Sequence, residues 1–175
     1  MLRVRMATLD DVPVITQLIA ELAAYEKQAD QVRTTEADIS RDGFGPHPEF
    51  RVLIAEWQGV PAGFAIFFGY YSTWRGTGLY LEDLFVRPEF RRLGIATALL
   101  ARVSRTAERE KRAFVRWAVL DWNQSAIALY RGLGADFMVE WQTVLLAGEP
   151  LKKLAEHSPS GLRDTALSRR SELLE

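Results

Sequence analysis

The feature that most constrains the fold is an apolar strand followed at once by a basic loop and a long amphipathic helix. The strand runs from Leu79 to Val86 and is closed by Arg87-Pro88, and the helix runs from Gly94 to about Glu110. Its apolar residues recur at helical spacing on one side: Ile95, Leu99, Leu100, Val103 and Ala107. A strand that is apolar on both faces is typical of a sheet covered by helices.

The remaining periodicities predict a mixed α/β (α+β) fold with the element order β-α-α-β-β-β-α-β-α-β. We expect a mixed, mostly antiparallel central sheet flanked by helices on both faces. The expected strands are Leu2–Met6, Phe50–Trp57, Ala62–Tyr71, Leu79–Val86, Ala113–Leu120 and Ala135–Leu146. The expected helices cover about 9–27 (capped by Thr8 with Asp11), a short stretch from Thr35 to Asp42-Gly43, Gly94 to about Glu110, and Asn123–Arg131.

We expect one domain over residues 1–148 and a C-terminal helix and tail over 149–175. Leu151 and Leu154 favour a short helix in this segment, and Ser158-Pro159-Ser160-Gly161 is typical of a linker. The last residues are either a disordered tail or an arm that contacts another subunit.

Composition excludes several classes of function. The 22 basic and 23 acidic residues give a net charge of −1, which offers no broad surface for nucleic acid or anionic membrane. No cysteine is available for a nucleophile, a disulfide or a thiolate metal site. The two histidines, His47 and His157, have no second ligand at helical or strand spacing, so we expect no metal. The N-terminus has no apolar signal segment, and we expect a cytoplasmic protein.

The loop between the strand and the long helix predicts a phosphate site. A helix N-terminus offers unpaired N–H groups and a positive dipole end, Gly94 and Ala96 let a ligand approach the backbone, and Arg91 and Arg92 add charge. The spacing [Arg/Gln]-x-x-Gly-x-[Gly/Ala] resembles the acetyl-CoA motif of the GNAT N-acetyltransferase superfamily. The alternative is a basic surface loop that only caps the helix.

Two adjacent acids, Glu82 and Asp83, interrupt the apolar strand. Alternation along a strand predicts that they point to opposite faces. Because an unpaired buried carboxylate is costly, at least one of them must face a wet cleft or find a partner. In one interpretation the strand is partly exposed and the two acids form ion pairs with nearby arginines. In the other, they act beside the bound acyl donor as a general base or as the wall of a cation-binding site.

A tyrosine lies two helical turns beyond a strand-to-helix corner. The corner is Asp121-Trp122-Asn123, with Asn123 a candidate N-cap, and Tyr130 follows seven residues later. Seven residues is also an ordinary core spacing, so a buried structural tyrosine is the alternative. In the superfamily that the loop resembles, a tyrosine on this helix commonly protonates the leaving thiolate.

Over residues 5–146 the sequence resembles the diamine (spermidine/spermine) N-acetyltransferase family, a branch of GNAT. The matching stretches are Leu18–Glu26, Asp42–Pro48, Tyr80–Asp83, the Arg91 loop, Asp121–Asn123 and Tyr130. The resemblance implies acetyl-CoA as co-substrate, a small-molecule amine as acceptor, and a homodimer, with 135–146 and the C-terminal arm as candidate contacts.

Individual roles follow from the resemblance by position. It implies that Tyr130 is the general acid and that Glu82 is a water-mediated base and amine contact. The residues implied to bind the cofactor are Leu84, Phe85 and Val86 through their backbone, Arg91, Arg92, Leu93, Gly94, Ile95, Ala96 and Thr97 at the pyrophosphate, and Asn123 at the pantetheine. The residues implied to bind the acceptor are Tyr25, Glu26, Trp74, Glu82, Asp83 and Trp141.

The chain departs from the family pattern at two places. Ser72 stands where the family has a further acid. The segment between Ala135 and Trp141 is shorter than in the animal enzymes of the family. These changes leave three alternatives: a polyamine or diamine acetyltransferase, which we favour; an enzyme for a lysine-like (thialysine) amino acid or other amine; and a non-catalytic acyl-CoA-binding module.

Overall fold

The structure is a computed structural model that describes residues 1–157. The chain divides into two compact units, the first spanning Met1–Asn123 and the second beginning at Gln124. The linker expected at Ser158-Pro159-Ser160-Gly161 lies outside the described residues.

The first unit is built on one five-stranded sheet with the order β1-β2-β3-β4-β5. The strands are β1 (Leu2–Met6), β2 (Arg51–Trp57), β3 (Val60–Ser72), β4 (Gly76–Val86) and β5 (Val115–Arg116). Each pairs with the next in antiparallel direction except β5, which runs parallel to β4. The expected mixed, mostly antiparallel sheet is therefore confirmed.

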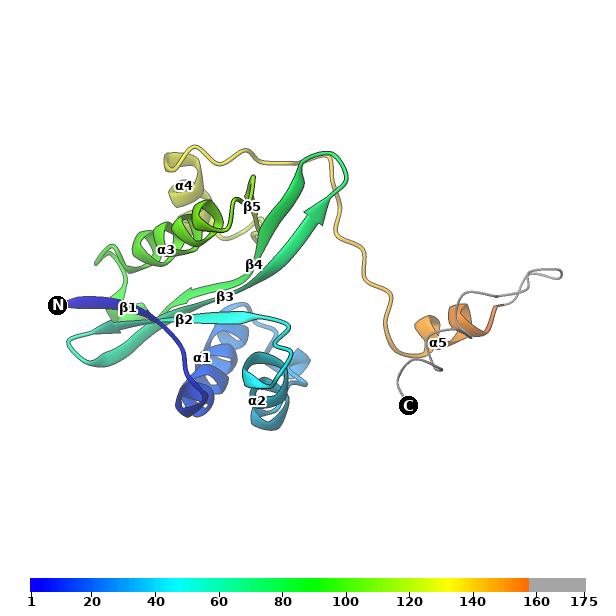
Figure 1. Cartoon of the computed structure of the whole chain (residues 1–175), viewed down its shortest axis with the longest axis horizontal. Helices are drawn as coiled ribbons and strands as arrows, with labels where there is room; N and C mark the ends of the chain where they lie inside the picture. Colours follow the sequence, from blue (N-terminus) through cyan, green and yellow to red (C-terminus); the bar gives the residue numbers. More distant parts are fainter. Residues whose placement is uncertain (158–175) are drawn as a thin grey trace. The chain divides into compact units, whose positions relative to one another are not determined.

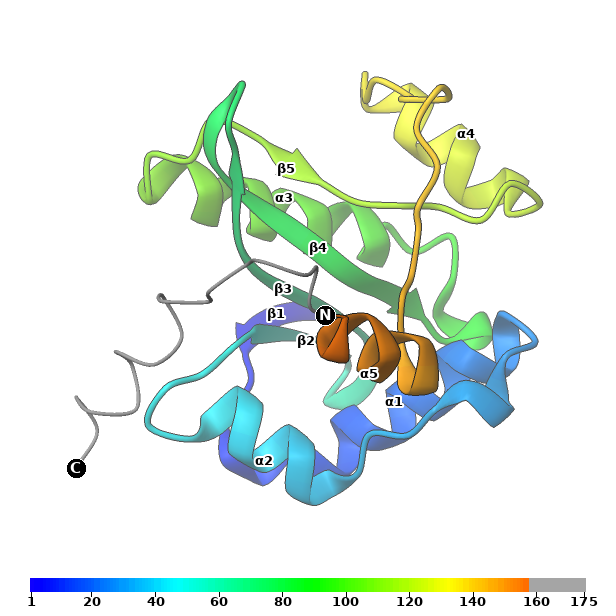
Figure 2. The ribbon, with the colours of Figure 1, turned by 90° about the vertical axis from the view of Figure 1, so that its right-hand side faces the viewer.

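Helices cover both faces of this sheet (Figures 1 and 2). One face carries α1 (Val12–Tyr25) and α2 (Glu36–Phe44), and the other carries α3 (Ile95–Arg109). Short 3₁₀ turns lie at Leu9–Asp11, Ala29–Gln31 and Pro88–Phe90. The core on the α1 side is formed by Val12, Ile15, Leu18, Leu22, Ile39, Val52, Ile54, Phe64, Ile66 and Phe85.

Local caps fix where the first helical segments begin. Thr8 and Asp11 form a capping box before the 3₁₀ turn that leads into α1, and Thr35 and Asp38 form another at α2. Arg5 donates from Nη1 and Nη2 to the two carboxylate oxygens of Asp11, each at 2.7 Å. This pair ties the start of the helical segment to β1, and the N-cap expected at Thr8 is confirmed.

Two expected strands differ from the structure. The strand expected at Ala113–Leu120 is reduced to the two residues of β5. The strand expected at Ala135–Leu146 is wrong, since this segment has turn and irregular backbone. A polar–apolar alternation forms a strand only where a neighbouring edge pairs with it, and among the described residues the sheet ends at β5.

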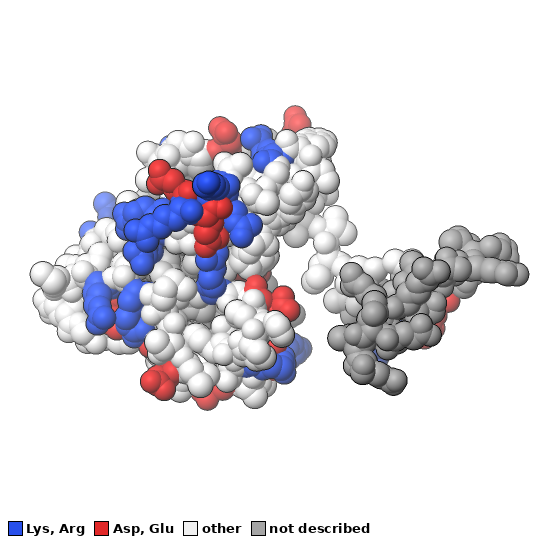
Figure 3. Space-filling view, in the orientation of Figure 1, with Lys and Arg blue, Asp and Glu red and all other residues white. Residues whose placement is uncertain are grey.

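The second unit contains two helices, α4 (Gln124–Gly132) and α5 (Gly148–Glu156). The buried residues of α4 are Ile127 and Tyr130. Among residues 1–157 no helix is both long and apolar enough to cross a membrane. On the face of the first unit that Figure 3 shows, basic and acidic side chains lie next to one another.

Candidate active site

The edge of β4 becomes free of its neighbour halfway along the strand. β5 pairs with β4 only at Leu79↔Val115 and Tyr80↔Arg116 among the described residues. Beyond Tyr80, β4 continues to Val86 with β3 on one side, while β5 no longer follows it on the other. Such an edge presents backbone N–H and C=O groups that an extended ligand with amide groups can pair with. The predicted cofactor residues Leu84, Phe85 and Val86 lie on this stretch.

The predicted phosphate loop leads directly into α3. Gly94 is its N-cap and has φ 76°, a left-handed conformation that glycine adopts at little cost. A Cβ placed on Gly94 would meet no atom within 4 Å, so the glycine is needed for its backbone angle and the space beside it is open. Arg91, Arg92 and Leu93 are exposed. The first amides of α3 and its dipole therefore face accessible space, a favourable arrangement for an anion.

Tyr25, at the end of α1, connects this loop to the corner after β5. The guanidinium of Arg91 lies 4.5 Å from the centre of the Tyr25 ring and donates from Nε to the carbonyl of Val86 at 3.1 Å. The Tyr25 hydroxyl donates to Oδ1 of Asn123 at 3.4 Å, and its ring packs against Trp122 with centroids 5.7 Å apart. A residue predicted for the acceptor thus contacts residues predicted for the cofactor.

A β-bulge brings the acids of β4 together with the end of α1. Ile66 is opposite Asp83 and Phe67 is opposite Leu81, so Glu82 is an extra residue on β4. The expectation of opposite faces rested on unbroken alternation, which the bulge interrupts. Burial, then the charges of Glu82 and Glu26, raises the pKa of Asp83 to about 7. Burial also raises the pKa of Glu26. We call the carboxylates of Glu26, Glu82 and Asp83 the acid cluster.

Next to the acid cluster lies a strip of aromatic rings that ends in an arginine. Tyr80 stacks on Phe68 with centroids 5.4 Å apart and contacts Tyr70 at 5.9 Å. Burial, then Glu82, raises the pKa of Tyr80. Arg116 donates from Nη1 to the hydroxyl of Tyr70 at 3.1 Å, and its Cζ lies 5.8 Å from the centre of that ring. We call Phe68, Tyr70, Tyr80 and Arg116 the aromatic strip.

Local sequence patterns do not single out any member of the aromatic strip as a site residue. The available signal was an arginine, Arg116, within a segment expected to be a strand. Its importance depends on its register opposite Tyr80, and register between strands distant in sequence is not a local property.

Three predicted residues lie outside these groups. Trp74 is in the turn between β3 and β4 and is 81% exposed. Ser72, where the resemblance places a further acid, accepts hydrogen bonds at Oγ from the amides of Trp74 and Arg75 and so closes this turn. Tyr130 and Trp141 belong to the second unit, Tyr130 buried in α4 and Trp141 just after a turn.

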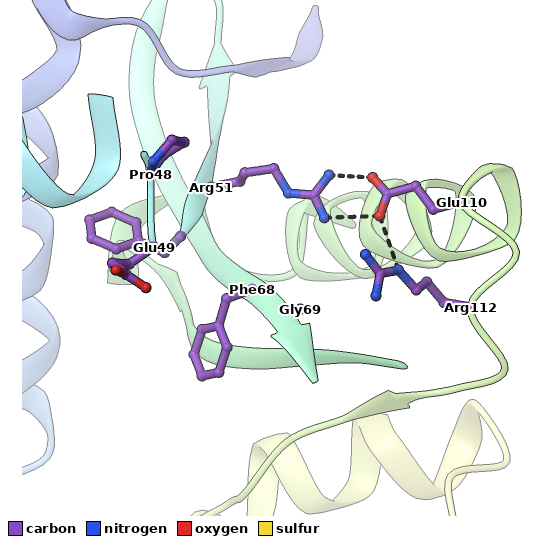
Figure 4. A pocket seen from close by; sticks show the side chains of 8 residues that line it. Pro48, Glu49, Arg51, Phe68, Gly69, Glu110 and Arg112 are labelled. Carbon is purple, nitrogen blue, oxygen red and sulfur yellow. Dashed lines mark hydrogen bonds and ion pairs between the residues drawn. The ribbon is translucent and has the colours of Figure 1, made fainter. Parts of the chain in front are cut away.

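A hollow on the first unit, which Phe68 of the aromatic strip also lines, contains a network of ion pairs (Figure 4). Both Arg51 on β2 and Arg112 after α3 pair with Glu110, and the pairing with Arg51 lowers the pKa of that carboxyl. Arg51 also lies over the ring of Phe67 at 4.7 Å. These contacts join the start of β2 to the end of α3, and we assign the hollow a structural role.

Comparisons with known proteins identify the family. The model of the acetyltransferase (GNAT) family matches residues 15–135. A thialysine N-epsilon-acetyltransferase of Bos taurus is 38% identical over 163 residues, covering 87% of this chain and 96% of that protein. The spermidine/spermine N(1)-acetyltransferase-like protein 1 of Homo sapiens is 39% identical over 140 residues, covering 76% of this chain and 20% of that protein.

A solved structure of an aminoglycoside N-acetyltransferase in complex with CoA has the same fold, with a TM-score of 0.67 at 19% identity over 85% of this chain and 95% of that one. The chain belongs to the GNAT acetyltransferase family. It is an acetyl-CoA-dependent N-acetyltransferase that acts on amines, so the expected family and activity are confirmed.

Proposed function

We propose that this enzyme transfers the acetyl group of acetyl-CoA directly to the terminal primary amine of a lysine-like amino acid or diamine. The observation that carries the proposal is the arrangement of the first unit. In this unit the unpaired edge of β4 and the open N-terminus of α3 lie near the acid cluster. The edge and helix suit an anionic thioester with amide groups, and the acids suit a cation.

The free edge of β4 and the start of α3 fit acetyl-CoA. Backbone groups of Leu84, Phe85 and Val86 would pair with the pantetheine amides as a neighbouring strand does. The amides of residues 92–97 and the dipole of α3 would hold the pyrophosphate. Arg91 is already engaged with Tyr25 and Val86, so Arg92 is the basic side chain that we assign to the pyrophosphate.

The acid cluster receives the amine as a cation and helps to remove its proton. A lysine-like amine has a pKa of about 10.4 and is almost entirely protonated at neutral pH. Glu26 and Asp83 lie in partly buried positions, where their attraction for an ammonium is stronger than in water. Glu82 is exposed at the bulge, and we assign it the role of accepting the proton through a water molecule.

The transfer itself needs no acyl-enzyme, since the chain has no cysteine. The amine nitrogen attacks the thioester carbonyl carbon, a C–N bond forms and the C–S bond breaks. The thiolate then takes a proton from Tyr130, the role that the family resemblance implies. Backbone N–H groups of β4 stabilise the negative charge that develops on the carbonyl oxygen.

Two acceptor classes remain, and the relatives favour one of them. The thialysine acetyltransferase matches this chain over 96% of its own length, whereas the spermidine/spermine-related protein matches over 20%. Ser72 closes a turn where the diamine family has a further acid, which removes one charge from a channel for polyamines. A lysine-like amino acid is therefore our first candidate and a diamine or polyamine the second.

We further propose that the enzyme is cytoplasmic and that it is a homodimer. The family resemblance implies the homodimer, with residues 135–146 and the C-terminal arm as contacts. Sedimentation equilibrium of the full chain tests it. A single species at the mass of one 19.8 kDa chain across micromolar concentrations would exclude the dimer.

A thiol-release assay with acetyl-CoA tests the activity. The panel contains lysine, thialysine, ornithine, cadaverine, putrescine, spermidine and spermine, with a control that lacks amine. Turnover with one or more of these amines supports the proposal, and its absence from the whole panel, while acetyl-CoA still binds, would refute it.

Tyr130→Phe tests the general-acid role. We expect acetyl-CoA affinity to stay unchanged and kcat to fall about 10²- to 10⁴-fold, the usual contribution of a positioned acid. Calorimetric binding of acetyl-CoA measures the first quantity and thiol release the second. A kcat equal to that of the wild type would exclude Tyr130 as the acid.

A further inference from the structure

The aromatic strip lies on the same face of the sheet as the acid cluster. Ile66 belongs to the core under α1, and Phe68 and Tyr70 follow it at strand period on β3, so they point to that face. Tyr80 stacks on Phe68, and Arg116 lies over Tyr70. Asp83 stands opposite Ile66 in the register, which places it on this face too. Acids, rings and arginine therefore follow one another along one surface.

The distances along this surface match a small molecule with charges at both ends. Arg116 is the register partner of Tyr80, and Glu82 is two residues further along β4. The guanidinium of Arg116 lies over the ring of Tyr70, whose register partner on β4 is Gly78. At about 3.3 Å per residue, Gly78 and Glu82 are about 13 Å apart along β4. An extended lysine-like amino acid, with a hydrogen-bonded contact of about 3 Å at each end, can span this separation.

We propose that Arg116, held on the Tyr70 ring, binds the α-carboxylate of the acceptor and makes the enzyme selective for diamino acids over diamines. This inference rests on the proposed function. It assigns a position to each part of the acceptor: the reacting amine lies at the acid cluster, the methylene chain lies over Tyr80 and Phe68, and the carboxylate meets Arg116.

The charge of Arg116 separates the two acceptor classes. A guanidinium is always protonated and its planar fork matches the two oxygens of a carboxylate. A diamine or polyamine of the same length would place a second ammonium near this guanidinium, where like charges repel. The contact with Tyr70 fixes the guanidinium before the acceptor arrives, so little side-chain freedom is lost on binding.

All members of the aromatic strip are partly exposed rather than buried in the core. An acceptor can therefore reach the rings, and their faces can cover its methylene chain. The strip also explains why Tyr80 is a large polar aromatic in a strand whose neighbours, Leu79 and Leu81, are fully buried.

The test compares acceptors that differ only in the carboxylate: lysine with cadaverine, and ornithine with putrescine. The measured quantity is the ratio of kcat/KM within each pair for the wild type, Arg116→Gln and Arg116→Lys. A ratio taken on one preparation does not depend on how much of that variant is folded. Arg105→Gln, on the exposed side of α3, serves as the control with the same loss of charge.

We expect the wild type to prefer the amino acid of each pair. Arg116→Gln should lower that preference about 10- to 100-fold, the usual effect of losing one hydrogen-bonded ion pair, through a higher KM for the amino acid. Arg116→Lys should keep part of the preference, because it keeps the charge but loses the fork. Arg105→Gln should leave the ratio unchanged.

Two results would overturn the inference, and a third concerns the proposed function instead. Equal ratios in the wild type and in Arg116→Gln would show that Arg116 does not select the carboxylate. A wild-type enzyme that prefers cadaverine to lysine and putrescine to ornithine would contradict the proposed selectivity for diamino acids. No turnover with any acceptor would instead contradict the proposed function, so the two failures are distinguishable.

Discussion

Asp83 gives a prediction in which stability and acceptor binding depend on the same carboxyl group. Burial beside Glu82 and Glu26 raises its pKa from 3.8 to about 7 in the folded protein. The folded state therefore holds a proton at pH values where the unfolded state has lost it. By linkage, Asp83 reduces the free energy of unfolding as the pH rises from about 4 to about 7, and the reduction is complete above pH 7.

The magnitude follows from the difference in pKa. A difference of about 3 between the folded and unfolded pKa values, at 1.36 kcal/mol per pKa unit, corresponds to about 4 kcal/mol at pH 8. At pH 5 the same relation gives about 1.5 to 2 kcal/mol, because pH 5 is only about one pH unit above the pKa of the carboxyl in the unfolded chain. Asp83→Asn removes this term, so its gain in stability should be about 2 to 3 kcal/mol larger at pH 8 than at pH 5.

Urea unfolding of the wild type and Asp83→Asn at the two pH values measures this difference. Glu108→Gln, on the exposed side of α3, is the control, because this carboxylate is not among the groups that raise the pKa of Asp83. An equal effect of Asp83→Asn at pH 5 and pH 8, or a loss of stability at pH 8, would refute the assignment. The variant should also bind a cationic acceptor less tightly at pH 8, because the charge that attracts the ammonium is gone.

Two further predictions concern the phosphate loop and the first helical turn. Gly94→Ala should cost about 1 kcal/mol of stability and raise the KM for acetyl-CoA, because alanine disfavours φ 76°. Gly94→Asn should have a smaller effect on both quantities, because asparagine tolerates this conformation better. Equal KM values for both variants and the wild type would contradict this prediction. Asp11, whose pKa is lowered to about 2 chiefly by its hydrogen bond from Arg5, should stabilise the fold by about 2 kcal/mol above pH 4 and lose this contribution as the pH falls to 2. Urea unfolding of Asp11→Asn should therefore show a deficit at pH 7 that shrinks at pH 2.5, and a deficit independent of pH would count against the ion pair.

Features that depend on neighbouring residues in the sequence were predictable. The cap formed by Thr8 with Asp11, the start of α2 after Thr35 and the start of α3 at Gly94 follow from residues within one helical turn. The antiparallel order of β2, β3 and β4 follows from short connections.

Features that depend on pairing across the sheet were not predictable. The bulge at Glu82 interrupts the alternation along β4, and it exists only in the register with β3. The strand expected at 135–146 lacks the pairing edge that its alternation assumed. The contact of Arg116 with the aromatic strip depends on its position opposite Tyr80. Each of these depends on a contact between residues far apart in sequence.

The early separation of β5 from β4 has a consequence for handling the protein. A strand edge with unsatisfied hydrogen-bonding groups can recruit another polypeptide as readily as a ligand, and such edges begin aggregation. A co-substrate that completes the ladder beyond Tyr80 would occupy this edge. Because the co-substrate binds the folded state, it would also shift the folding equilibrium toward that state by mass action. CoA in the storage buffer should therefore slow the loss of monodisperse protein, most clearly at temperatures where unfolding begins.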